Sequence, residues 1–342
     1  MRRVAIFCLL TAFITAGCGG KTNPDDMITA SNFQLDTVVT LSLYGYDDKT
    51  VLDDAFGEID RLEKILSRTY DGSDTDRLAK SSGKDFVQVS PETLFLIRES
   101  ERYSQLSGGL FDVTIGPLVS LWDIHDGSGH FPSDEERDEV MALVDHDELT
   151  VRGNEAMLER EGMAADFGAI AKGYIADKVK SLLIQKGVTS GVINLGGNVL
   201  LIGGKPNGEN FRIGVQDPDA ATGEYLGVVE VSDKSLVSSG PYERYFIHDG
   251  IRYHHILSPK TGFPVENELS QVTIISDESV TGDALSTTAF LMGLTEGMKL
   301  IDSIPGVSAI FVTKDKEVYL SGGFNEIFFI TNDEYKLKEE TP

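Results

Sequence analysis

Both cysteines of this 342-residue chain, Cys8 and Cys18, lie close to its amino terminus. The rest of the chain therefore has no pair of thiols for a disulfide and no thiolate cluster for zinc or an iron–sulfur centre. A chain of this length has to gain its stability from a buried apolar core. Its composition, with 41% hydrophobic and 25% charged residues, is that of a globular protein that can build such a core.

The amino terminus has the pattern of a secretory signal peptide. Arg2 and Arg3 form a basic start, residues 4–14 form a largely apolar run, and small residues follow up to Cys18. The run is too short for a membrane-spanning helix, which needs about 20 apolar residues. We therefore expect residues 1–17 to be a signal peptide that the mature protein lacks.

The position of Cys18 also predicts a lipid anchor. A small-residue stretch that ends in cysteine resembles the lipobox of bacterial lipoproteins, although Thr15 stands where that pattern prefers an aliphatic residue. We expect Cys18 to be lipidated and residues 18–30 to form a tether. The protein would then be held at the membrane of the cell envelope, facing the periplasm or the outside. Simple secretion, with Cys18 an ordinary thiol, is the alternative.

The charge of the chain limits its partners. The formal net charge is −25, which makes nucleic acid a poor partner. The same field repels any anionic ligand, so a substrate with phosphate groups would need a local cation or oriented backbone amides. We therefore expect a site for such a substrate in segments that could supply these groups.

Apolar spacing predicts a mixture of helices and strands without an internal repeat. Apolar residues at three- and four-residue intervals predict a helix over 52–66, and Ser90 followed by Pro91 is typical of a helix start. Residues 188–330 read mostly as short strands. The other expected elements are a strand over 37–43, helices over 169–186 and near 283–293, and a hairpin turn at Asp249-Gly250.

No composition break or flexible linker divides the middle of the chain. We therefore expect a single interleaved α+β unit over residues 31–332, with mostly antiparallel strands in its C-terminal half. Residues 333–342 read as a charged tail outside this unit.

Residues 165–177 form a candidate phosphate cradle. Small residues at 168, 169, 171 and 173 let the backbone approach a ligand closely, a helix start offers free N–H groups, and Lys172 adds a mobile positive charge. The segment lacks the Gly-Lys-Ser/Thr triplet of a Walker A loop. Taken alone, it is more often a small-residue helix packed tightly on a sheet.

Two further segments carry groups that suit phosphate chemistry. Asp283 and Thr287 lie four residues apart on an expected helix, which places a carboxylate and a hydroxyl within reach of one hard cation such as Mg²⁺. An aspartate at a helix start is more often a cap. His254 and His255 lie on an expected strand, so they point to opposite faces and at most one can face a site. A histidine pair on a hairpin is more often a surface feature.

Taken together, these segments resemble the FAD:protein FMN transferase (ApbE) family, and the resemblance extends from about Phe33 to Phe329. Several motifs in the family's order are far more specific than any one of them. The motifs that carry it are 107–119 (SGGLFDVTIGPLV), 166–174 (DFGAIAKGY), 193–198 (INLGGN), 255–262 (HILSPKTG) and 283–287 (DALST).

The resemblance implies roles for residues at matching positions. Magnesium would be bound by the Ala169 carbonyl, Asp283 and Thr287, while Ser286 stands where some members carry another aspartate. Asn198 likewise stands where the family often has aspartate. The implied FAD contacts are Leu35 and Tyr70 on the flavin side, Leu110, Phe111 and Asp112 on the adenosine side, Asp166 and Lys172 at the polar middle, and His255 and Val265 nearby.

The implied reaction is Mg²⁺-dependent transfer of FMN from FAD to a threonine or serine hydroxyl of an acceptor flavoprotein, with release of AMP. His255 would be the general base, because an imidazole ordinarily titrates near neutral pH, with Asp283 or a magnesium-bound hydroxide as the alternative. Two rival functions stay open. Water could replace the hydroxyl, which would make the protein an FAD pyrophosphatase, or the protein could bind flavin without turnover.

Overall fold

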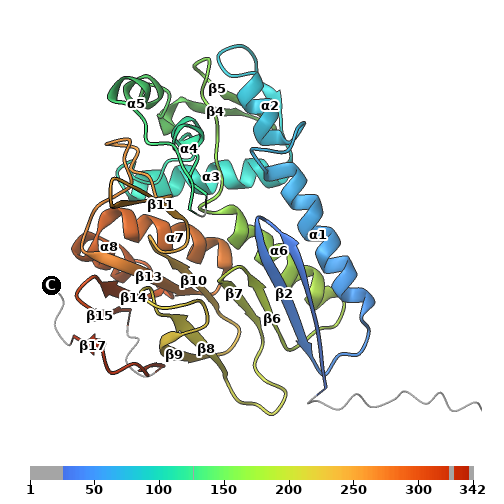
Figure 1. Ribbon diagram of the computed structural model, residues 1–342. Coiled ribbons are helices and arrows are strands. Elements are labelled where there is room, and N and C mark those ends of the chain that lie inside the picture. Colours follow the sequence, from blue (N-terminus) through green and yellow to red (C-terminus); the bar gives the residue numbers. More distant parts are fainter. Residues whose placement is uncertain (1–25, 126, 323–326, 339–342) are drawn as a thin grey trace, which may run out of the picture.

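The computed structural model describes residues 26–125, 127–322 and 327–338 (Figure 1). The expected signal peptide, residues 1–17, and Cys18 lie outside the described residues. A nine-stranded sheet forms the centre of the fold, in the order β1-β2-β6-β7-β10-β13-β14-β15-β17. All neighbours in it are antiparallel except β15 and β17. These strands are β1 Met27–Gln34, β2 Thr37–Tyr44, β6 Gly191–Leu195, β7 Asn198–Ile202, β10 Ser235–Ser239, β13 Leu269–Ser276, β14 Ser308–Thr313, β15 Glu317–Ser321 and β17 Lys336–Leu337.

Helices cover one face of this sheet. In Figure 1, α6, α7 and α8 lie behind the strands, and their apolar residues join the inner sheet face in the main core. Strand β13 is buried along its whole length because both of its faces are covered. The helices are α1 Thr50–Leu66, α2 Asp74–Lys80, α3 Pro91–Leu106, α4 Gly116–Trp122, α5 Asp134–Met141, the 3-10 helix η1 His146–Glu148, α6 Ala171–Gln185, α7 Ser279–Met292 and α8 Leu294–Asp302.

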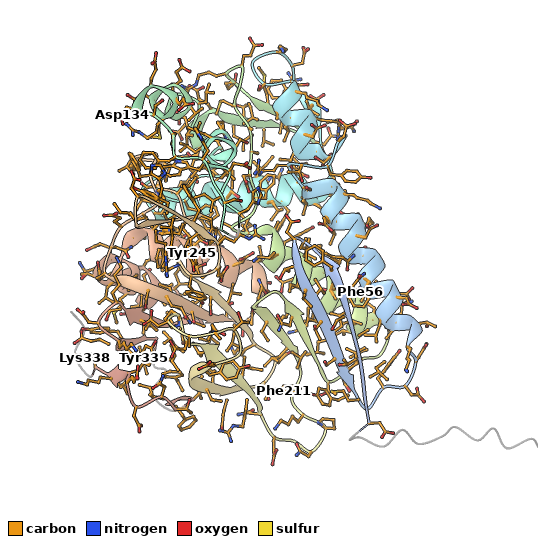
Figure 2. All side chains as sticks on the ribbon, viewed as in Figure 1. Phe56, Asp134, Phe211, Tyr245, Tyr335 and Lys338 are labelled. Atoms are coloured by element: carbon orange, nitrogen blue, oxygen red, sulfur yellow. The ribbon has the colours of Figure 1, made fainter. Side chains whose placement is uncertain are left out.

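A second core lies on the other face of the sheet. It is formed against a three-stranded sheet in the order β16-β9-β8 and includes Phe211 and Tyr335, both in the lower half of the molecule in Figure 2. A third apolar cluster surrounds Trp122 and contacts the β11–β12 hairpin. The remaining strands are β3 Val87–Gln88, β4 Leu149–Arg152, β5 Glu155–Leu158, β8 Phe211–Gln216, β9 Tyr225–Val231, β11 Tyr245–His248, β12 Ile251–His254 and β16 Phe328–Ile330.

The mixed α+β fold with mostly antiparallel strands is confirmed. Helix α1 covers the expected range, and the Ser90 hydroxyl accepts the Thr93 N–H at the start of α3. The hairpin turn connects β11 and β12 as expected, with positive φ at both Asp249 and Gly250.

Other boundaries differ from the expected ones. Strand β1 begins at Met27, inside the expected tether 18–30, because it pairs along its length with β2. Strand β17 lies inside the expected tail 333–342, because it pairs with β15. Helix α6 begins at Ala171 rather than 169, helix α7 begins four residues before 283, and α8 was not expected from the sequence. Within the described residues, no helix is both long and apolar enough to cross a membrane.

Candidate active site

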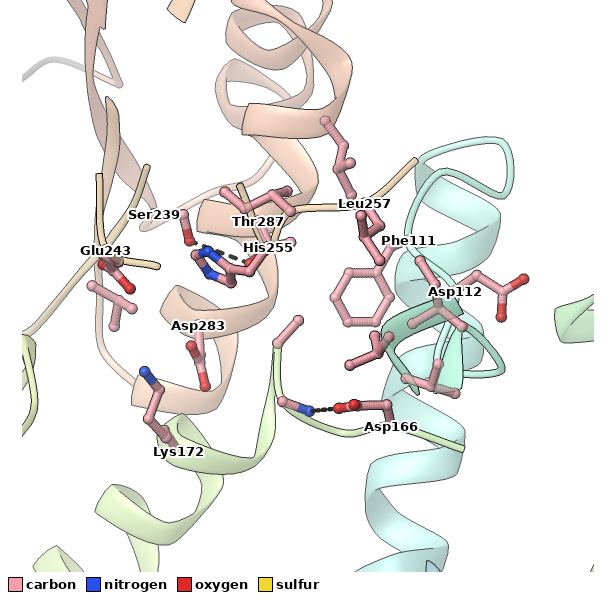
Figure 3. Close-up of a pocket in the computed structure, with 18 of the residues that line it drawn as sticks. Phe111, Asp112, Asp166, Lys172, Ser239, Glu243, His255, Leu257, Asp283 and Thr287 are labelled. Carbon is pink, nitrogen blue, oxygen red and sulfur yellow. Dashed lines mark hydrogen bonds between the residues drawn. The ribbon is translucent and has the colours of Figure 1, made fainter. Parts of the chain in front are cut away.

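A cleft at the N-terminal ends of α6 and α7 brings the separate sequence motifs together. It holds about 910 Å³ of empty space, part of it open to solvent. Figure 3 shows Lys172 and Asp283 on one side of it, His255 and Thr287 beside them, and Phe111 on the opposite wall. The residues with polar side chains that line it are Asp112, Asp166, Lys172, Asn198, Ser238, Ser239, Glu243, His255, Asp283 and Thr287.

The loop before α6 forms the floor of the cleft. Asp166 accepts the Gly168 N–H at 2.7 Å and pairs with Arg68 Nε at 3.0 Å, so both carboxylate oxygens have partners. These bonds hold the loop in the conformation that presents Ala169 and Lys172 to the cavity. All three of the predicted residues in this segment therefore line the cleft.

Helix α7 supplies Asp283 and Thr287, which both line the cleft. The Asp283 side chain is 4% exposed, and its Oδ2 accepts the Gly173 N–H of α6 at 2.8 Å. Burial raises the pKa of Asp283, and the charge of Lys172 opposes this shift. Because α7 begins at Ser279, Asp283 is not the cap of its own helix, which was the more common interpretation of an aspartate near a helix start. The Thr287 hydroxyl lies 3.2 Å from Ser239 Oγ.

Ser286 faces away from the cleft. Its hydroxyl donates to the Asp283 carbonyl at 2.9 Å and lies 2.8 Å from Ser239 Oγ, and its side chain is fully buried. The hydroxyl therefore has partners within the protein, and Ser286 does not line the cavity.

His254 and His255 point to different surroundings, as the alternation of a strand predicts. His254 Nε2 lies 3.0 Å from the Val265 carbonyl oxygen, away from the cleft, whereas His255 lines it. Val265 contacts the main core and does not line the cleft, although the family resemblance placed it near the dinucleotide.

His255 differs from the expected base in its pKa. Burial lowers the pKa of His255 to about 3, and the neighbouring His254, Arg244 and Lys172 contribute to this shift. The expectation of an imidazole that titrates near neutral pH therefore does not fit this environment. His255 Nδ1 lies 3.2 Å from the Arg244 carbonyl oxygen, so in the neutral ring Nδ1 carries the proton and Nε2 keeps a free lone pair.

The opposite wall contains the three residues expected on the adenosine side. Leu110 and Phe111 line the cleft, and Phe111 packs in turn on Tyr103, with ring centroids 5.8 Å apart. Asp112 Oδ1 accepts both the N–H and the hydroxyl of Thr114 at 2.7 Å, and burial raises the pKa of Asp112. The Asp112 carboxylate therefore stabilises the turn formed by residues 112–114.

A wider groove continues from the cleft and holds one of the two residues expected on the flavin side. Leu35 lines it, with φ of 55° and its N–H donating to Glu63 Oε1 at 3.0 Å. Tyr70 lines neither the cleft nor the groove and is 48% exposed, although Arg68 and Thr69 beside it do line the groove.

Glu243 was missed by the sequence analysis. It lines both the cleft and the groove, and the surrounding protein raises its pKa although the side chain still reaches solvent through the opening. The charge of Lys172 opposes this shift and that of Asp283 adds to it. Glu243 follows β10 in a segment without a recognisable spacing signal, so only the fold places it at the site.

The donors in the cleft suit a hard divalent cation. Asp283 is a buried carboxylate whose hydrogen bonds among the described residues come from backbone N–H groups. Buried charges are normally paired or coordinate metals. The Ala169 carbonyl and the Thr287 hydroxyl belong to residues of the same cavity and provide oxygen ligands of the kind that Mg²⁺ prefers. No cluster of three or more His, Cys, Asp or Glu suited to a metal occurs in the described part of the chain, so this set would be mixed.

Comparisons with known proteins agree with this arrangement. Residues 35–311 match the model of the ApbE family. An FAD:protein FMN transferase of Klebsiella pneumoniae is 36% identical over 285 residues, which are 83% of this chain and 88% of the relative. One from Treponema pallidum is 30% identical over 337 residues, 93% of this chain and 92% of the relative.

The fold matches solved structures as well. The flavin transferase ApbE from Vibrio cholerae superposes with a TM-score of 0.79 and 26% identity, over 89% of this chain and all of that one. The ApbE protein from Thermotoga maritima gives a TM-score of 0.79 with 29% identity, over 88% of this chain and 99% of that one. Because the family match covers most of the chain and relatives at 30% identity or more span nearly all of it, the chain belongs to the ApbE family.

Proposed function

We propose that this protein transfers FMN from FAD to a threonine or serine hydroxyl of another protein, releases AMP, and requires Mg²⁺. The observation that supports this most strongly is the meeting of Lys172, Asp283, Thr287 and His255 in one cleft, from three separate segments of the chain. The names of the relatives support flavin transfer, while the metal, the acceptor residue and the second product rest on the chemistry of the cleft.

Some residues of the cleft would bind FAD and Mg²⁺, and another would accept the proton of the acceptor hydroxyl. Lys172 would contact the pyrophosphate of FAD, since it is the only Lys or Arg among the described residues that line the cleft. Ala169, Asp283 and Thr287 would hold Mg²⁺. When bound, the metal would neutralise charge on the pyrophosphate oxygens. Leu110 and Phe111 offer an apolar wall for part of the dinucleotide.

The chemical step moves one phosphoryl group. The acceptor oxygen forms a bond to the phosphorus of the FMN half, and the bond from that phosphorus to the bridging oxygen breaks, so that the bridging oxygen leaves on AMP. The acceptor proton passes to Nε2 of His255, which has the free lone pair. The low pKa keeps this ring unprotonated at neutral pH but also makes it a weak base, so the proton has to leave it readily to water.

Attachment to the membrane is part of the proposal. Acylation of Cys18 and export through residues 1–17 remain predictions from the sequence, because both lie outside the described residues. An anchored enzyme that faces the periplasm or the outside would meet acceptor flavoproteins in the same membrane.

The proposal is tested by incubating the chain with FAD, Mg²⁺ and an acceptor flavoprotein subunit, and measuring in-gel flavin fluorescence of the acceptor together with AMP. We expect a fluorescent, flavin-labelled acceptor and one AMP released for each flavin attached. His255→Ala should lower transfer by about 10²- to 10⁴-fold while FAD still binds. His130→Ala, a half-exposed histidine paired with Glu136, is the matched control and should transfer normally.

Four results would contradict the proposal or one of its parts. AMP without labelled acceptor would indicate a pyrophosphatase, and bound FAD without either product would indicate a flavin-binding protein. Transfer that is unaffected by EDTA would exclude the metal. Near-normal transfer by His255→Ala would remove this histidine from the base role.

A further inference from the structure

The start of helix α7 is capped by a residue from another helix. Its own N-cap residue, Glu278, makes no side-chain hydrogen bond there. Instead, Asp177 of α6 accepts the Ser279 N–H on Oδ1 and the Val280 N–H on Oδ2, each at 2.8 Å. One carboxylate therefore satisfies two of the four amides that a helix start leaves free.

Helix α7 caps α6 in return. Asp283 of α7 accepts the N–H of Gly173, which lies in the first turn of α6. The pattern is reciprocal, because Asp177 lies four residues after Gly173 and Asp283 lies four residues after Ser279. Because each helix donates amide hydrogen bonds to a carboxylate of the other, these contacts fix the position of one helix along the axis of the other and its rotation about that axis.

The helices approach most closely at this point. A Cβ atom on Gly173 would lie 2.3 Å from the Ser279 carbonyl oxygen, so only glycine fits there. A fourth hydrogen bond fixes the same turn to the sheet, since Ser279 Oγ donates to Asn198 Oδ1 of β7 at 2.7 Å.

We propose that Asp177 is a positioning residue for flavin transfer, which holds the first turn of α7 against α6 and so sets Asp283 and Thr287 opposite Ala169 and Lys172. The inference rests on the proposed function. Asp177 lines neither the cleft nor the groove, so it acts through the helices and touches no substrate.

A carboxylate is needed for this role because both of its oxygens accept an amide. In Asp177→Asn, one side-chain oxygen can still accept a hydrogen bond from one of the two helix amides. The NH₂ group then faces the other amide, and because both groups are donors, no hydrogen bond forms there. The side chain keeps its size, so the variant tests the bond pattern rather than the packing. Glu278 and Lys180 are the charged residues that act most on Asp177, and burial raises the pKa of Asp177 to about 6.

The test compares Asp177→Asn with wild-type protein and with Asp134→Asn, an 89% exposed aspartate in the first turn of α5. At saturating Mg²⁺, we expect Asp177→Asn to bind FAD with unchanged affinity and to lose about 10²-fold in kcat, as a displacement of about 1 Å can cause. The variant should need more Mg²⁺ for half-maximal rate. KM for FAD should stay the same. Asp134→Asn should match wild type in every measurement.

Two outcomes would overturn the inference. One is a wild-type kcat and Mg²⁺ requirement in Asp177→Asn, and the other is a parallel loss of FAD binding, thermal stability and rate, which would indicate a merely structural role. Should wild-type protein itself transfer no flavin, the proposed function fails instead.

Amide hydrogen exchange of the wild-type protein gives a check that does not depend on folding of the variant. Ser279, Val280 and Gly173 should be protected like the middle of a helix, although they lie in first turns. Exchange as fast as that of the first turn of α5 would mean that the reciprocal caps do not form.

Discussion

A methyl group at Gly173 tests the contact between α6 and α7 directly. In Gly173→Ala the new Cβ would lie 2.3 Å from the Ser279 carbonyl oxygen, 2.6 Å from its carbon and 2.7 Å from Asp283 Cβ. Non-bonded carbon atoms normally sit about 3.5–4.0 Å apart. The first two of these atoms belong to backbone, which cannot turn aside, so α6 has to move away from α7 by roughly 1 Å.

The expected magnitudes follow from this displacement. Overpacking of a close contact costs about 1–3 kcal/mol, and we expect the upper part of that range because the obstacle is backbone. Replacing a helical glycine by alanine returns about 0.5–1 kcal/mol. The net loss in the free energy of unfolding is therefore about 1–2.5 kcal/mol. The rate of flavin transfer should fall about 10²-fold, since Lys172 and Asp283 move apart.

Gly57→Ala is the matched control. Gly57 lies in the middle of α1, and a Cβ there would meet nothing within 4 Å. This variant should gain about 0.5–1 kcal/mol in the free energy of unfolding and keep the wild-type rate. Urea unfolding and the transfer assay, applied to both variants, separate helix propensity from helix contact.

The reasoning is refuted if Gly173→Ala is as stable as Gly57→Ala, because α6 and α7 would then not be in the close contact described. A destabilised Gly173→Ala with full transfer activity would refute the second step, that the spacing of the two helices controls the rate.

Two further predictions concern the metal and the buried histidines. At pH 7, Mg²⁺ should raise the Tm of wild-type protein and not that of Asp283→Ala, and an equal shift in both would remove Asp283 from the metal site. Burial lowers the pKa of His254 to about 4, so the folded state favours the neutral ring. Below pH 6.5 the unfolded chain binds a proton that the folded protein does not, so the folded protein becomes less stable as the pH falls. Between pH 6.5 and 4, the free energy of unfolding should therefore decrease more steeply for wild-type protein than for His254→Gln, by up to about 1.4 kcal/mol per pH unit. Urea unfolding over this pH range measures the difference, and parallel profiles for the two proteins would contradict the prediction.

The elements that the sequence predicted well are those whose signals are local. The apolar spacing of α1 lies within its own 17 residues, and the cap of α3 is formed by Ser90 and Thr93, three residues apart. The hairpin turn needs only Asp249 and Gly250 in left-handed conformations. None of these features depends on a distant part of the chain.

The boundaries that differed depend on distant partners. The start of helix α7 at Ser279 is capped by Asp177, which lies 102 residues away in the sequence. The neighbouring Glu278 forms no side-chain cap, so the local sequence does not indicate where the helix begins. The eight-residue β1 pairs with β2, and the two-residue β17 pairs with β15. Such pairing cannot be read from the alternation of a single segment.

The candidate site divides in the same way. Motifs identified Lys172, Asp283, Thr287 and His255, and the fold brings all four to one cleft. Motifs could not show that burial lowers the pKa of His255, because the groups responsible come together only in the folded protein. Glu243 was missed for the same reason. Tyr70 and Val265 were carried over by position alone, and neither lines the cleft.

The charge of the cleft explains how so acidic a protein could hold FAD. Lys172 is the only Lys or Arg among the described residues that line it, and it faces two carboxylates, Asp283 and Glu243. With both ionised, these three side chains carry a net charge of about −1, which repels a pyrophosphate. One divalent cation at Asp283 would reverse the sign of the local charge. Because FAD adds negative charge beside that cation, each ligand favours binding of the other, and by reciprocity the two affinities rise by the same factor. With such a metal in place, a net charge of −25 would not prevent FAD binding but would make that binding depend on the metal.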